Sequence, residues 1–432
     1  MLCSPSIFTD CRASSAFMLR TACAFIHFVI RTHVHKKSTH VNRHAHLTDS
    51  TAVSWSRWLA VIALGISAFA IVTTELAPIG LLSPLAADFG QTEARAGLIV
   101  TAYAWVAAII ALLSATCLGR LPRKPLLVVL MVILALSSLT AAQGSQFITL
   151  LMARMVGALA HGVFWTIIGA TAAQLVPARR LGLASSIIFG GVSAASVVGI
   201  PLANLLTQFS GWRTAFMAIA ALSLLTALII AFTVPHVPPA PSLGIKALLQ
   251  VLRHRTLVAL YAVTAGAITA HFAAFTYIEP ALSQLLNMPP TTVSGLLLIF
   301  GLAGIAGNVI SGRLMDRYLK RLVTLALAVI ALCLIALSAL PIRGMIMPLA
   351  LLLVGWGMGI AIVFVGLQTW VLRLAGDAAM PASALHVAIF NAAIGAGALL
   401  GGIVITGFGI AGMMVIMAVV VMLSALCVMR LK

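Results

Sequence analysis

Two carboxylic acids, Glu75 and Glu279, lie inside long apolar segments of this 432-residue chain and are the groups best suited to proton chemistry. A charged carboxylate in hydrocarbon costs roughly 3 kcal/mol on insertion scales, so it persists where it pairs, faces water or becomes protonated. If neighbouring segments cross a membrane in opposite directions, Arg154 lies at a depth similar to that of Glu75. Burial disfavours a charged carboxyl group and a nearby guanidinium favours it. This pair could therefore exchange a proton, and a permanent structural salt bridge is the alternative.

Glu279 precedes Pro280 near the end of its apolar segment. It could gate or couple a pathway there, or it could be a solvated helix end. His161 follows Arg154 by two helical turns on the same face, and His271 precedes Glu279 on another segment. A neutral imidazole can donate to and accept from a hydroxyl group, or relay a proton. Each histidine could instead be buried and bonded to a neighbouring helix.

Aromatic rings and amides within other apolar segments could add a binding site for a small polar solute. A flat aromatic ring packs against an apolar face of the solute, while amides hydrogen-bond its hydroxyl groups. Each polar group could instead lie at a helix–helix contact, where it contributes about 0.6 kcal/mol on average. The candidate substrate-binding residues are His161, Trp165, His271, Trp105, Asn308 and Asn391.

Twelve long apolar stretches between Trp58 and Met429 must position these residues. The composition is 62% hydrophobic and 8% charged, with a mean hydropathy of +1.15, which is too little charge for the surface of a soluble protein. A bilayer core about 30 Å thick needs roughly 20 apolar residues per helix. The sequence therefore predicts an all-α polytopic membrane protein with twelve transmembrane helices. The predicted spans are 58–82, 96–118, 125–143, 147–175, 181–209, 212–234, 257–285, 291–312, 322–342, 345–372, 380–408 and 410–429.

The net charge of +18 has an uneven distribution along the chain. Lysine and arginine concentrate in alternate connectors between the predicted spans, which is the positive-inside pattern of membrane proteins. The charge therefore indicates orientation in a lipid bilayer, and we expect no nucleic-acid partner. We predict a multi-pass protein of the inner (plasma) membrane with both termini in the cytoplasm.

Three boundaries divide the chain. Residues 1–54 are rich in histidine and are expected to be a disordered or wrongly assigned N-terminal extension, with a metal-binding or targeting tail as the alternative. The proline-rich loop 235–256 then separates two bundles, 55–234 and 257–432. The two halves of the sequence resemble each other, because Glu75 and Glu279 occupy corresponding positions in them. Two pseudo-symmetric six-helix bundles are a plan in which a solute binds between the halves.

Several functional classes are disfavoured by what the segments contain. The sequence has no Gly-x-x-x-x-Gly-Lys-Ser/Thr loop, so ATP hydrolysis on this chain is not expected. No acid pair, metal cluster or nucleophile–base spacing occurs in the predicted helices, so we expect no enzyme, catalytic residue, metal or cofactor. Another alternative is a membrane sensor that does not transport a solute. The lack of an output domain in the sequence argues against it.

Several motifs resemble those of the major facilitator superfamily. Residues 312–321 are similar to its inner-loop signature, and Gly190, Gly199 and Pro201 are similar to its helix-5 antiporter motif. Residues 211–216 are typical of the arabinose-efflux-like branch of its drug:proton antiporters. Segments resembling bacterial sugar efflux transporters are 73–82, 103–106, 160–165 and 277–280.

This resemblance covers about residues 56–430 and implies a proton-coupled secondary transporter. It would export small sugars or sugar-like compounds from the cytoplasm by alternating access, and we expect it to act as a monomer. Multidrug or nucleoside efflux by the same fold is the alternative, since close relatives export such compounds. The first-half inner loop departs from the signature, because Gly119 stands where an acid is expected. The expected gating residues are Asp316, Arg317, Arg313 and Glu279.

Overall fold

Helices make up nearly all of the chain that the structure describes, and strands do not occur in it. The computed structural model describes residues 54–117, 121–177, 180–239, 244–339 and 344–431. The predicted extension, apart from its last residue, lies outside these ranges, and so does Gly119 of the first-half inner loop. Residues 54–432 form one compact unit.

The helices follow one another along the chain with short connections. The first half contains α2 (Trp55–Leu76), the 3₁₀ turn η1 (Ala77–Leu81), α3 (Leu82–Asp88), α4 (Glu93–Ala96), α5 (Leu98–Cys117), α6 (Arg123–Gln143), α7 (Phe147–Leu175), α8 (Leu181–Ala194), the π-helical turn η3 (Ala195–Gly199), α9 (Ile200–Ser210) and α10 (Trp212–Thr233). The second half contains α11 (Ile245–Val251), α12 (Arg255–Phe275), α13 (Ile278–Pro280), the π-helical turn η4 (Ala281–Leu285), α14 (Pro290–Ala339), α15 (Ile346–Ala375), the 3₁₀ turn η5 (Gly376–Ala378) and α16 (Ala379–Arg430).

Nine helical segments among the described residues are long and apolar enough to cross a membrane. The two longest are each broken where the backbone leaves helical geometry. Tyr318 interrupts α14 with φ −127° and ψ 25°. Gly376 separates α15 from α16 with φ 51°, and Gly409 interrupts α16 with φ 69°, a conformation open chiefly to glycine. Divided at these breaks, the nine segments give the twelve predicted transmembrane helices.

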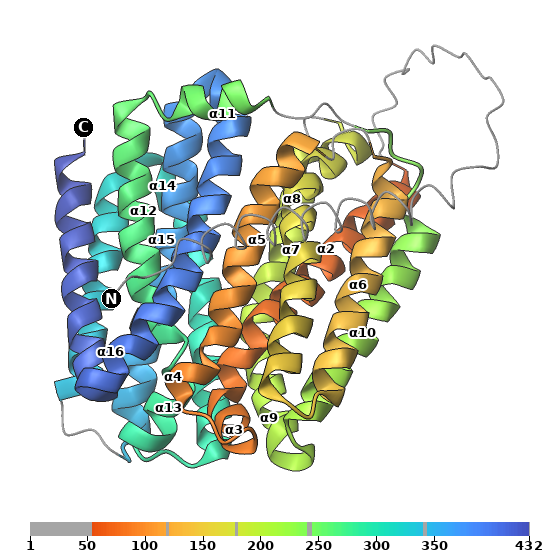
Figure 1. Cartoon of the computed structure of the whole chain (residues 1–432). Helices are drawn as coiled ribbons and strands as arrows, with labels where there is room; N and C mark the ends of the chain where they lie inside the picture. The colour runs from red at the N-terminus through yellow and green to blue at the C-terminus, as the bar shows by residue number, and fades with distance from the viewer. Residues whose placement is uncertain (1–53, 118–120, 178–179, 240–243, 340–343, 432) are drawn as a thin grey trace, which may run out of the picture. The chain divides into compact units, whose positions relative to one another are not determined.

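The helices form two pseudo-symmetric six-helix bundles, coloured orange to green and green to blue in Figure 1. In the first bundle α6 packs on α7 and α10, α2 on α8 and α10, and α5 on α7. In the second, α14 packs on α15 and α16, and α12 on α16. The bundles meet along α5 and α16 and along α9 and α14. The fold therefore matches the prediction, while the boundaries at 234 and 257 stay a prediction.

The two ends of this helical unit differ in how the bundles are joined. We call the end with Arg123, Asp316 and Arg373 the basic end; it lies beside α11 in Figure 1, and α3, α4 and α13 mark the opposite end. Hydrogen bonds between the bundles join Ser83 to Glu279, Glu93 to Gln284, Asn204 to Ser294, Gln208 to Pro290, Trp105 to Ala392 and Ser193 to Asn308. At the basic end, the described residues of the two bundles share no such bond. The bundles are thus tied together away from the basic end.

Candidate functional site

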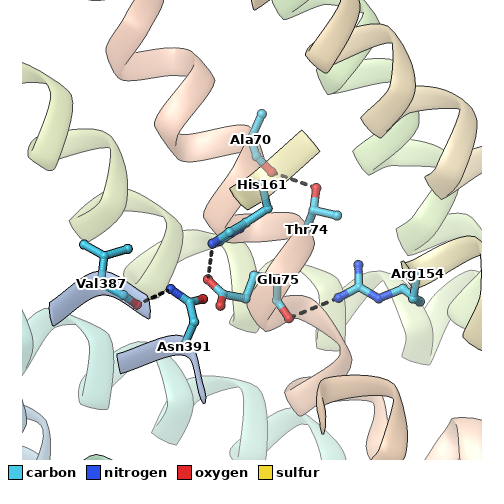
Figure 2. Close-up of polar contacts among 7 residues, drawn as sticks. All are labelled: Ala70, Thr74, Glu75, Arg154, His161, Val387 and Asn391. Carbon is cyan, nitrogen blue, oxygen red and sulfur yellow. Dashed lines mark hydrogen bonds and ion pairs between the residues drawn. The ribbon is translucent and has the colours of Figure 1, made fainter. Parts of the chain in front are cut away.

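Glu75 lies in the last turn of α2 with 8% of its surface exposed. Its Oε2 lies 3.9 Å from Nε2 of His161 on α7, a contact that is an ion pair only if the imidazole is protonated (Figure 2). Its Oε1 has no hydrogen-bond partner among the described residues. A buried carboxylate with so few donors is incompletely satisfied when charged. The geometry therefore suits a group that binds and releases a proton.

Arg154 approaches Glu75 in a way that the sequence did not predict. Its Nη2 donates to the backbone carbonyl of Glu75 at 3.3 Å, not to the carboxylate (Figure 2). The cause is that α2 ends at Leu76, so the last carbonyls of the helix lose their helical donors and accept from side chains. The guanidinium also lies 4.2 Å from the centre of the Tyr103 ring, a cation–π contact. The ion pair between the Glu75 carboxylate and Arg154, which the sequence allows, is therefore not formed in this conformation, although the two groups are neighbours.

Arg154 itself is almost fully buried, at 1% exposure. Its Nε and Nη1 have no hydrogen-bond partner among the described residues, and the same holds for the Tyr103 hydroxyl and His161 Nδ1. Buried donors and acceptors are rarely left unpaired unless water or a ligand satisfies them. This group of polar atoms around Glu75 is therefore suited to a polar solute or to a path for protons.

Aromatic rings extend from His161 along α7. Tyr103 packs edge-on against the imidazole with ring centres 5.4 Å apart. Trp165 lies on the other side, 6.3 Å from the imidazole, and it stacks on Phe189 of α8 at 6.1 Å and an interplanar angle of 21°. The sequence predicted Trp165 but assigned no role to Tyr103 or Phe189. Neither ring has a polar neighbour in the sequence that would have set it apart from core aromatics.

Trp105 and Asn391 link the first bundle to α16. The indole Nε1 of Trp105 donates to the backbone carbonyl of Ala392 at 3.1 Å. Asn391 donates from Nδ2 to the carbonyl of Val387 in its own helix at 2.9 Å, and its Oδ1 has no partner among the described residues. In Figure 2 the Asn391 amide extends from α16 in the direction of the Glu75 carboxylate. Both predicted residues thus lie where the bundles meet.

Asn308 reaches across the same interface on the α14 side. Its Nδ2 donates to the Ser193 hydroxyl of α8 at 3.1 Å. Asn308 thus lies at a helix contact between the bundles, and its substrate role stays a prediction. Ser193 was not identified from the sequence.

The predicted antiporter motif follows α8 and η3. A Cβ atom added to Gly199 would lie 2.8 Å from the Thr73 hydroxyl, so only glycine permits this approach to α2. Pro201 is buried in the first turn of α9, and a Cβ atom added to Gly190 would meet no atom within 4 Å. Gly199 therefore has a packing role next to the helix that carries Glu75, and Gly190 has open space around it.

His271 lies in a separate aromatic cluster of the second bundle. Its Nδ1 accepts a hydrogen bond from Nε1 of Trp356 on α15 at 3.1 Å. Its ring stacks on Phe275 at 5.2 Å and meets Phe364 edge-on at 5.7 Å. This is the environment of a buried histidine bonded to a neighbouring helix, which was the alternative to substrate binding. A substrate role for His271 stays a prediction.

Removing this buried bond should destabilise the second bundle. We expect Trp356→Phe to lower the free energy of unfolding by about 1–3 kcal/mol, because the His271 nitrogen loses its donor inside the protein. Thermal unfolding of the purified protein in detergent would measure the change. Trp55→Phe, at an exposed position, is the control and should leave the unfolding midpoint unaltered. Equal unfolding midpoints for the two variants would show that the hydrogen bond does not stabilise the protein.

Glu279 is not the solvated helix end considered above, because only 6% of its surface is exposed. Its Oε2 accepts from the backbone N–H of Ser83 in the other bundle at 2.9 Å, and its Oε1 accepts from the Ser283 hydroxyl at 3.2 Å. Beside it, Gln284 donates to Glu93 Oε1 across the interface at 2.8 Å. Sequence reasoning could not predict the burial, because the other bundle provides it.

A second polar cluster at the opposite end was missed from the sequence. Asn204 on α9 donates from Nδ2 to the carbonyl of Gly80 at 2.6 Å. Its Oδ1 accepts from the Ser294 hydroxyl of α14 at 2.5 Å and from Gln208 Nε2 at 2.9 Å. Gln208 also donates to the carbonyl of Pro290 at 2.8 Å. This Asn204 cluster joins the segment directly after the Glu75 helix to the second bundle.

Among the described residues, the predicted gating residues of the basic end form no ion pair or hydrogen bond that joins the bundles. Asp316 is exposed and pairs with Arg373 of the same bundle. Arg313 and Arg317 are exposed as well. The acid–base contacts of this loop are thus local here, and its gating role stays a prediction.

Metal ligation receives no support from this geometry. Among the described residues, no group of three or more histidine, cysteine, aspartate or glutamate side chains could hold a metal ion.

Solved transporter structures share the fold. A bacterial homologue of the human lysosomal transporter Spinster, in an inward-facing and unoccupied conformation, has a TM-score of 0.71 and 14% identity over 87% of this chain and 97% of that chain. The nucleoside transporter NupG has a TM-score of 0.68 and 15% identity over 87% and 99% of the two chains. The human organic anion transporter MFSD10 has a TM-score of 0.64 and 18% identity over 86% and 99%. At these identities the likeness shows the fold alone.

The sequence profile of the Major Facilitator Superfamily matches residues 58–385. This stretch holds Glu75, Arg154 and His161 together with most of both bundles. Transporters of this superfamily are also the proteins whose solved structures resemble the fold. The chain therefore belongs to the Major Facilitator Superfamily and is a membrane-spanning transporter, not an enzyme.

Proposed function

We propose that this protein is a proton-coupled exporter of small sugars or sugar-like compounds that works by alternating access. The supporting observation is the buried carboxyl group of Glu75, with the His161 imidazole 3.9 Å away and the Arg154 guanidinium bonded to its backbone. An ionisable acid inside a membrane indicates a function, because placing a charge in hydrocarbon costs free energy. Polar atoms of Arg154, Tyr103 and Asn391 that have no hydrogen-bond partner among the described residues support a polar solute beside it.

The proposed cycle follows from the two ends of the molecule. We assign the basic end to the cytoplasm of a cell with an inner membrane, as the positive-inside pattern favours. Glu279 and the Asn204 cluster then close the outer side in this conformation, and substrate enters from the cytoplasm. When the bundles rock, a proton from outside binds Glu75 as substrate leaves. Reopening to the cytoplasm then releases the proton, which completes one antiport step.

A nucleoside exporter of the same fold is the second candidate. The fold of the nucleoside transporter NupG resembles that of this chain, and a nucleoside also carries a sugar ring with hydroxyl groups. A multidrug exporter has less support, because the predicted spans contain no acid deeper in the membrane than Glu75 that could attract a cationic drug. Competition by nucleosides against labelled sugar would separate the two candidates.

Efflux from loaded cells tests the proposal. Cells that express the protein are loaded with radiolabelled arabinose or a thiogalactoside, and efflux is followed with and without an uncoupler. We expect export faster than in cells without the protein, and a fall towards that background once the uncoupler removes the proton gradient. Efflux that is unchanged by the uncoupler would exclude proton antiport as the transport mechanism. If efflux of both sugars equals background while nucleosides are exported, the result would favour the second candidate, a nucleoside exporter.

A further inference from the structure

We infer that Phe189 and Trp165 form a stacking surface that selects ring-shaped, hydroxyl-bearing solutes over open-chain solutes of similar composition. The inference rests on the proposed function and names the feature of the substrate that the site recognises. The surface is defined by the two stacked rings, 6.1 Å apart and 21° from parallel. No motif in the sequence pointed to Phe189.

The position of Phe189 on α8 places it between the bundles. Ser193 lies one turn along the same face of α8 and bonds to Asn308 of the second bundle. Farther along, Gly301 of α14 packs closely against Ser196. The face of α8 that carries Phe189 is therefore the face that meets α14, and Phe189 lies one turn nearer the basic end than the Ser193–Asn308 contact.

Phe189 is nevertheless 58% exposed. Among the described residues, no hydrogen bond joins α8 to α14 between the Ser193–Asn308 contact and the basic end, and Phe189 lies on that side of the contact. Under the orientation proposed above, this is the side from which the substrate enters.

The chemistry of the two rings defines a class of solute. A pyranose presents a flat set of C–H groups on one face and hydroxyl groups at its edge. Aromatic rings bury such a face with a preferred geometry, and convergent polar groups then fix its orientation. Asn308 and Ser193 supply an amide and a hydroxyl one turn away from Phe189. An open-chain polyol has the hydroxyl groups but no rigid apolar face.

The stacking surface is also connected to the proton site. Trp165 lies 6.3 Å from the His161 ring, and His161 lies 3.9 Å from the Glu75 carboxylate. A ring seated on Phe189 and Trp165 is therefore separated from the acid by two side chains, Trp165 and His161. This arrangement lets the presence of substrate influence the environment of His161 without a direct bond to Glu75.

Competition in inside-out membrane vesicles tests the inference. Vesicles take up a labelled thiogalactoside under a proton gradient, and unlabelled methyl galactopyranoside and galactitol compete with it. We expect the parent protein to prefer the pyranoside. Phe189→Ala should reduce that preference by about two- to twelvefold, the range that corresponds to one aromatic contact of about 0.5–1.5 kcal/mol. Phe189→Trp should restore it, because an indole offers a larger flat face.

Phe232→Ala is the matched control, because Phe232 on α10 is 86% exposed and makes no ring contact among the described aromatic residues. It should keep the parent's preference. A Phe189→Ala protein that transports the label with the parent's full preference would overturn the inference and identify Phe189 as a lipid-facing residue only. A parent that takes up no sugar at all would overturn the proposed function together with it. The two failures are thus distinguishable.

Discussion

Glu75→Gln is expected to abolish export against a concentration gradient while leaving exchange of substrate down its gradient. The amide keeps the size and most of the hydrogen-bonding capacity of the carboxyl group, but it cannot bind or release a proton. The proton gradient then has no means of driving the conformational cycle. We expect the rate of concentrative transport to fall roughly tenfold or more, which corresponds to a lost coupling free energy of at least about 1.4 kcal/mol.

The measurement is proton-driven uptake into inside-out vesicles, compared with exchange of labelled for unlabelled substrate in the same vesicles. Asp377→Asn is the control, since Asp377 lies exposed in η5 between α15 and α16. It should retain both activities. If the Glu75→Gln protein concentrates substrate as well as the control does, the coupling acid is another residue.

Asn204→Ala is expected to shift the conformational equilibrium towards the state that is open at the opposite end. The substitution removes three hydrogen bonds, to the Gly80 carbonyl and from Ser294 and Gln208. The Gly80 carbonyl then loses its side-chain donor inside a largely buried contact, while Ser294 and Gln208 keep their bonds to Pro290 and to each other. A loss of about 1–3 kcal/mol in the closed state corresponds to a shift of roughly 5- to 150-fold in the population ratio.

Spin labels at Arg95→Cys and Thr291→Cys would report this shift as a distance distribution across the opposite end, one label on each bundle. Both positions are exposed, so labelling should not disturb the fold. Gln143→Ala, an exposed amide at the end of α6, is the control and should leave the distribution of the parent unaltered. A distribution for Asn204→Ala that coincides with the control would exclude the Asn204 cluster as a latch.

The helices could be predicted from the sequence because hydrophobicity along each segment is local information. The predicted span 181–209 covers α8, η3 and α9 almost to their ends, and 212–234 matches α10 to within a residue. The span 58–82 includes the turn η1, which hydrophobicity does not distinguish from an α-helix. The proximity of Arg154 and Glu75 also followed from helical spacing and antiparallel direction, whereas the contact between His161 and Glu75 was not predicted.

The partners of individual side chains could not be predicted, because they depend on how separate helices meet. The guanidinium of Arg154 bonds to a carbonyl that is free only because α2 ends at Leu76. Glu279 is buried by Ser83, which is far away in the sequence. Asn204 and Ser294 likewise belong to different bundles, and each alone resembles an ordinary polar residue of a helix contact.

Proton release on substrate binding tests the central claim most directly. The purified protein, in weakly buffered detergent solution with a pH indicator, is mixed with a thiogalactoside at a series of starting pH values. The proposed antiport predicts that the parent releases protons in a window of pH and that Glu75→Gln releases none. Equal release from the two proteins, or no release from the parent at any pH at which it binds the sugar, would contradict the account.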